Sequence, residues 1–109
     1  MRKVIMYLYF RYREPLTLEK IAAYAHLHPN YLCSIFKSYA GRTVMEQLTQ
    51  TRVDAAKYLL RRDSLSMPQV AELTGFPSER TFYRQFKQLT GMTPKEYQKA
   101  QIRAYAEYL

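Results

Sequence analysis

The sequence predicts an all-α fold of seven helices in which a unit of two short helices occurs twice. Apolar residues recur at helical spacing, and no segment alternates with period two for long enough to be a strand. The stretch from Leu16 to Thr43 aligns with the stretch from Leu65 to Thr93 once one residue is allowed as an insertion in the second copy. Two copies are too few for a solenoid, so we expect a duplicated unit.

The first helix is expected from Lys3 to Tyr12. It should end before Glu14-Pro15, because the residue that precedes a proline avoids helical backbone geometry.

The first two-helix unit follows, with Thr17 as the candidate N-cap and a turn through His26. Pro29 opens the second helix of this unit, which is expected at 29–39. The apolar residues of that helix that should face inward are Leu32, Ile35, Phe36 and Tyr39.

A long helix is expected between the two units, at 43–62. Thr43 and Glu46 form a capping box at its start. About 19 residues of helix would span about 28 Å, which is typical of a stiff spacer. The expected subdomains are therefore 1–42, the linker helix 43–62, and 63–109, which together make one domain.

The second unit repeats the plan of the first. Ser66 and Gln69 form a capping box, and Gly75 can adopt the positive φ of a tight turn. The second helix should run over 78–90 between the N-cap Ser78 and the terminating Gly91. Apolar residues expected to be buried in this unit are Val70, Ala71, Leu73, Phe82, Phe86 and Leu89.

A last helix should begin at Thr93-Pro94, with Glu96 completing its capping box. A short helix, a tight turn and a second helix with a spare polar face make a helix-turn-helix motif, so the chain is expected to contain two of them.

The charge of the chain favours a polyanionic partner. Net charge is +8, from 17 Lys and Arg against 9 Asp and Glu. The basic residues lie in periodic, folded segments, which favours nucleic acid over a membrane. The single Cys33 cannot form an internal disulfide, and we find no signal sequence or membrane-spanning run, so a cytoplasmic location is expected.

Catalytic and metal-binding motifs are not found. The sequence lacks a glycine-rich phosphate loop, a nucleophile with a base, and a paired-carboxylate site, so we predict no enzyme activity and no cofactor. His26, His28 and Cys33 would supply at most three metal ligands, so no metal site is expected. Cys33 is interpreted as a small neutral residue rather than a redox site.

Several short motifs run along nearly the whole chain: Leu16-Thr17-Leu18, Tyr31-Leu32 to Phe36-Lys37, Val70-Ala71, Gly75-Phe76, and Gly91-Met92-Thr93-Pro94 to Tyr97. The chain resembles the DNA-binding domain of the AraC/XylS family of transcription regulators. The resemblance implies a bacterial regulator, usually an activator, that binds double-stranded DNA and contacts RNA polymerase. It also implies that any effector binds a domain absent from this chain. His28 replaces the usual serine N-cap, and His26 stands at the position of Gly75, so we expect weaker geometry in the first unit.

The second helix of such a motif enters the major groove with its N-terminal half near the bases. The candidates for base contacts are Asn30, Tyr31, Cys33 and Ser34 in the first unit and Glu79, Arg80, Tyr83 and Arg84 in the second. The candidates for phosphate contacts are Lys37, Arg42 and Lys87. Since the two helices differ, the DNA site should be asymmetric, with blocks in successive major grooves. If straight DNA does not match a rigid linker helix, either the DNA bends or only one unit contacts bases, and the sequence does not choose between these. The alternative is a protein-interaction module that contacts RNA polymerase or another regulator and has only non-specific DNA affinity.

Overall fold

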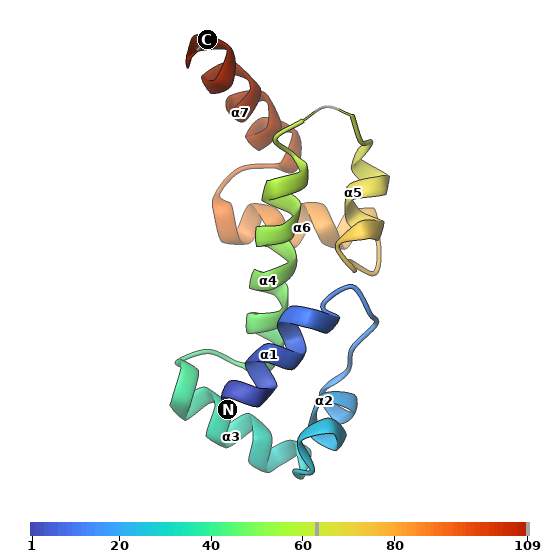
Figure 1. The fold of residues 1–109 in the computed structure, drawn as a ribbon, viewed down its shortest axis with the longest axis vertical. Coiled ribbons are helices and arrows are strands. Elements are labelled where there is room, and N and C mark those ends of the chain that lie inside the picture. The colour runs from blue at the N-terminus through green and yellow to red at the C-terminus, as the bar shows by residue number, and fades with distance from the viewer. Residues whose placement is uncertain (63, 109) are drawn as a thin grey trace. The chain divides into compact units, whose positions relative to one another are not determined.

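The computed structural model describes residues 1–62 and 64–108, and these residues form seven α-helices and no strand (Figure 1). The all-α prediction is therefore confirmed. The helices are α1 (Arg2–Arg11), α2 (Leu18–Ala25), α3 (Pro29–Ala40), α4 (Val44–Leu59), α5 (Met67–Leu73), α6 (Glu79–Thr90) and α7 (Pro94–Tyr108). The predicted boundary at residue 63 and the predicted end at residue 109 lie outside the described residues.

The chain divides into two compact units, Met1–Thr51 and the residues from Arg52 onward. The division falls inside α4, so the beginning of this helix belongs to the first unit and its end to the second. With 16 residues, α4 is about 24 Å long, which is shorter than the sequence predicted. The chain leaves the helix after Leu59, and the carbonyl oxygen of Arg62 accepts a hydrogen bond of 2.8 Å from the Gln98 side chain.

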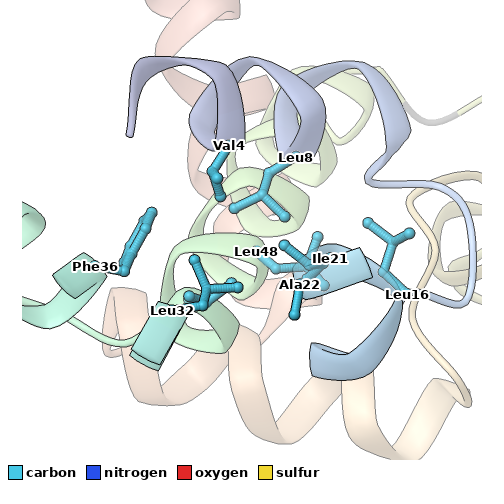
Figure 2. Packing of buried hydrophobic residues seen from close by; sticks show 9 residues of the cluster. Val4, Leu8, Leu16, Ile21, Ala22, Leu32, Phe36 and Leu48 are labelled. Carbon is cyan, nitrogen blue, oxygen red and sulfur yellow. The ribbon is translucent and has the colours of Figure 1, made fainter. Parts of the chain in front are cut away.

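The core of the first unit is formed by one face of each of α1, α2, α3 and the beginning of α4 (Figure 2). In Figure 2 the labelled side chains from these helices point toward one another and form one cluster. Its buried members are Val4, Leu8, Leu16, Ile21, Ala22, Leu32, Phe36, Val44 and Leu48. Full burial of one such Leu, Ile or Phe side chain contributes about 1.5–3 kcal/mol, so this cluster holds α1, α2 and α3 together.

Aromatic rings dominate the core of the second unit. The Phe82 ring lies 5.0 Å from that of Phe76 and 5.8 Å from that of Phe86, measured between centroids. Phe86 in turn meets Tyr97 of α7 at 5.5 Å, edge to face. Such pairs contribute about 0.5–1.5 kcal/mol each beyond the area that they bury, so Phe82 and Phe86 fix α6 to the unit.

Three residues predicted to face inward are exposed instead. Tyr39 is 62% exposed and Leu89 is 47% exposed, and Leu73 is exposed as well. Tyr39 and Leu89 occupy the same place in the two units, two residues before Gly41 and Gly91 respectively. The last turn of each helix therefore extends past the core, where correct helical spacing no longer implies burial.

The two turns have the same backbone geometry although their residues differ. His26 has a φ of +57° and Gly75 a φ of +84°, both in the left-handed region. In each turn the following N–H donates to the carbonyl five residues back, at 3.0 Å: Leu27 to Ala22, and Phe76 to Ala71. His26 and Gly75 therefore adopt the same left-handed conformation, and the steric cost is much higher for His26 because glycine has no Cβ.

Each second helix also begins with a side-chain cap. His28 Nδ1 accepts a hydrogen bond of 3.2 Å from the Asn30 N–H, and Ser78 Oγ accepts one of 3.0 Å from the Thr81 N–H. The histidine thus fills the role of the usual serine, with a partner one residue closer in the chain. The unusual residues of the first unit preserve the helix-turn-helix geometry.

Candidate nucleic-acid interface

Helix α6 separates its anchoring side chains from its exposed ones. Phe82 and Phe86 are fully buried, whereas Arg80 and Arg84 are exposed one turn apart on the opposite side. Within the described residues, neither guanidinium forms a hydrogen bond or an ion pair with another side chain. Both therefore keep their full set of donors for a ligand outside the protein.

The N-terminal half of α6 adds an acceptor and a phenol. Glu79, Arg80 and Tyr83 line one open depression. Tyr83 is half-buried with its ring edge-on to Phe82, at 5.8 Å between centroids. Burial, and secondarily the charge of Glu79, raises the pKa of Tyr83, so its hydroxyl stays protonated and remains a hydrogen-bond donor.

Helix α3 presents a surface of different chemistry. Its four predicted candidates, Asn30, Tyr31, Cys33 and Ser34, are all exposed and uncharged. When the N-caps His28 and Ser78 are aligned, three of these candidates match candidates on α6: Asn30 with Arg80, Cys33 with Tyr83, and Ser34 with Arg84. Tyr31 instead matches the half-buried Thr81, so it has no counterpart among the α6 candidates.

The predicted phosphate contacts Lys37, Arg42 and Lys87 lie near the junctions between α3 and α4 and between α6 and α7. In the first unit, Thr43 and Glu46 form a reciprocal capping box at the start of α4, with N···O distances of 2.8 and 3.0 Å. Hydrogen bonds to Thr43 lower the pKa of Glu46, and the charges of Lys37 and Arg42 add to this shift. Lys37 is exposed and Arg42 is half-buried.

The second unit repeats this arrangement. Thr93 and Glu96 form the equivalent box, at 2.8 and 3.1 Å. Hydrogen bonds to Thr93, and secondarily the charge of Lys87, lower the pKa of Glu96. Each glutamate carboxylate already accepts a hydrogen bond from the threonine N–H at the start of its helix. The exposed Lys37 and Lys87 are therefore better ligands for an anion than these helix N-termini.

Two exposed residues on the same faces were not among the sequence candidates. Ser38 and Gln88 lie one turn beyond Ser34 and Arg84, respectively. The spacing of four residues along a helix is the signal that would have identified them.

The described part of the chain contains no group of three or more His, Cys, Asp and Glu side chains that could hold a metal ion. Among the same residues, no helix combines the length and the apolar character needed to span a membrane.

In each unit a left-handed turn leads into a capped second helix with an exposed polar face, and this repeated arrangement defines a protein domain with a duplicated helix-turn-helix motif. A family model described as a helix-turn-helix domain matches residues 21–100. The uncharacterized regulator YtdP of Bacillus subtilis is 34% identical over 94 residues, which cover 86% of this chain and 12% of YtdP. The regulator YijO of Escherichia coli is 35% identical over 89 residues, which cover 82% of this chain and 31% of YijO. The chain belongs to the AraC/XylS family of transcription regulators.

Solved structures agree with this assignment. The DNA-binding domain of AdpA, determined in complex with a target DNA, has a TM-score of 0.86 and 26% identity over 91% of this chain and 89% of that one. The C-terminal domain of AraT from Geobacillus stearothermophilus also has a TM-score of 0.86, with 28% identity over 91% of this chain and 83% of its own. The chain spans less than a third of the length of YtdP and of YijO.

Proposed function

We propose that this chain binds double-stranded DNA sequence-specifically and regulates transcription, with α3 and α6 in successive major grooves of an asymmetric site. The observation that carries the proposal is the exposed pair Arg80 and Arg84, opposite the buried Phe82 and Phe86 of α6. The family supports it as well, since AraC-type relatives are transcription regulators and the similar AdpA domain was determined with a target DNA.

In this proposal α6 supplies most of the base recognition. A guanidinium can donate two hydrogen bonds to O6 and N7 of guanine, which contributes about 1–3 kcal/mol of discrimination for each good pair. Arg80 and Arg84 are spaced to reach neighbouring base pairs. Glu79 either accepts from cytosine N4 or orients Arg80, and the protonated Tyr83 hydroxyl donates beside them.

Helix α3 recognises a different sequence with weaker discrimination. Asn30 can form two hydrogen bonds with adenine, whereas Cys33 and Ser34 are short and offer single contacts. Tyr31 reaches out from the side of the helix and contacts a base or a sugar. Because the two faces differ, the site has two unlike blocks about 34 Å apart, centre to centre.

Phosphate contacts hold both helices in register. Lys37 and Lys87 contact phosphates because they lie in the last turns of α3 and α6, away from the N-terminal halves of those helices, and Arg42 does so because it follows α3 directly. Each neutralised phosphate adds about 0.9 to the slope of log affinity against log salt, and contributes no base discrimination.

The comparisons give no support to the alternative of a protein-interaction module with only non-specific DNA affinity. RNA polymerase as a partner, and an effector that acts on a separate domain, stay predictions from the family.

Selection of binding sites from random duplex DNA with the 109-residue chain, at two salt concentrations, tests the proposal. We expect one motif with two unlike blocks a helical turn apart, recovered at both concentrations. Binding without a motif that disappears as salt rises would contradict sequence-specific recognition, because phosphate contacts alone give that behaviour.

A further inference from the structure

The outer face of α1 carries an exposed apolar patch that DNA recognition does not use. Met6, Tyr9 and Phe10 are 49%, 62% and 69% exposed, and their spacing of three and four residues places them side by side. The rings of Tyr9 and Phe10 meet edge to face, with centroids 5.3 Å apart. At about 200 Å² for a whole side chain of this size, the patch exposes roughly 360 Å², an extent that on monomers often marks an interaction site.

The patch lies on the far side of α1 from the core of the first unit. Val4 and Leu8 bury the inner face of α1, and Figure 2 shows them entering the cluster from a different side than Leu32 and Phe36 of α3. The outer faces of α1 and α3 therefore point in different directions. If α3 lies in the major groove, as proposed above, the bound duplex leaves the α1 patch uncovered.

Most charged residues around the patch are basic. Arg2 lies four residues before Met6, and Arg13 lies three residues after Phe10, with its guanidinium 5.9 Å from the centre of the Tyr12 ring; both arginines are exposed, and α1 contains no acidic residue. Glu14 follows the helix, and its carboxylate pairs with Arg11 at 3.2 Å. Met, Tyr, Phe and Arg are the residue types enriched in the centres of protein interfaces. The arginines would repel those of a second copy of this chain, and they would attract carboxylates.

We propose that the α1 patch, formed by Met6, Tyr9 and Phe10 with Arg2 and Arg13 at its rim, docks an acidic amphipathic helix of a partner protein. The apolar side chains of that helix pack over the two rings and the methionine, and its carboxylates pair with the two arginines. The exposed area is well below the roughly 800 Å² that each partner buries in a standard stable interface, so the complex is short-lived.

The probe is a synthetic amphipathic helix with leucines at spacings of three and four residues and glutamates on both sides of that stripe. Its binding to the 109-residue chain is followed by amide chemical shifts, with and without a duplex obtained by site selection. We expect the shifts to concentrate on α1 and to persist when DNA is bound. The same peptide with lysines in place of glutamates should bind at least about tenfold more weakly.

Variants of the protein isolate the patch. Phe10→Ser and Tyr9→Ser should each lower the affinity for the glutamate peptide about tenfold, as truncation of a central aromatic residue does. Tyr105→Ser is the matched control, because Tyr105 is 66% exposed on α7, and it should leave the affinity unchanged. All three positions are exposed, so circular dichroism should show the helix content of the original chain.

Several results would overturn the proposal: shifts centred on α3 or α6, equal binding of the lysine peptide, or an affinity that Phe10→Ser leaves unchanged. Self-association that depends on protein concentration and is abolished by Phe10→Ser would identify a second copy as the occupant. Loss of duplex affinity in Phe10→Ser would assign the patch to DNA. Failure of the original chain to select any DNA motif would count against the proposed function and leave the peptide result standing.

Discussion

Replacement of Arg84 by alanine should remove recognition of one base pair while leaving the fold intact. The Arg84 side chain is exposed and forms no hydrogen bond or ion pair with any other residue in 1–62 or 64–108, so its loss should change the free energy of unfolding by less than about 0.5 kcal/mol. A bidentate contact with guanine contributes about 1–3 kcal/mol of discrimination. At one position of the site, the preference for guanine should therefore fall by about 5- to 150-fold.

The assay compares the affinity of the chain for the selected duplex and for duplexes in which each base pair is replaced in turn. Arg103→Ala is the matched control, because it removes the same charge from an exposed position on α7. Arg84→Lys keeps the charge but loses the planar pair of donors, so it should lose the base preference as well. If Arg84→Ala weakens binding to every duplex by the same factor, as Arg103→Ala should, then Arg84 contacts a phosphate and the assignment is wrong.

The remaining predictions concern salt, backbone strain and pH. Lys87→Ala should reduce the slope of log affinity against log salt by about 0.9 with base preference retained, and a changed preference in the site-selection assay would contradict the phosphate role. His26→Gly should raise the free energy of unfolding by about 0.5–1 kcal/mol in urea titrations, since relief of the left-handed strain exceeds the added flexibility of the unfolded chain; a decrease would refute it. Glu46 and Glu96 have lowered pKa values in the folded state, so their stabilisation is complete above the ordinary pKa of 4.5 and is lost as pH falls through the lowered values. A variant with both Glu46→Gln and Glu96→Gln should therefore show a weaker loss of thermal stability on acidification than the original chain, and an unchanged profile would show that other carboxyl groups dominate.

The helices were predictable because their ends carry chemical signals that act locally. A hydroxyl at an N-cap, a proline at the first position and a glycine at the end each satisfy or remove backbone groups within one turn of the chain. Burial was less predictable, because it depends on what lies opposite a residue. Tyr39 and Leu89 have the spacing of core residues, but the core ends before the last turn of each helix.

The candidate site was predictable to a similar degree. Exposure of Arg80, Arg84 and Asn30 follows from the position of the buried residues on the same helices. Tyr83 differs, because its ring rests against Phe82 and only the structure shows how much of it is buried. The apolar outer face of α1 was not predicted, because helical spacing shows which residues share a face but not whether anything covers that face.

The separation of buried phenylalanines from exposed arginines on α6 bears on how such a domain diversifies. Phe82 and Phe86 carry the packing, and Arg80 and Arg84 carry none of it. Mutation can therefore change the arginines without first losing a folded product, and under the DNA recognition proposed above such a change would give a daughter gene a new target site. Tyr83 has less freedom, since its ring also belongs to the core edge, and lineages that alter it must keep an aromatic ring or compensate for its loss.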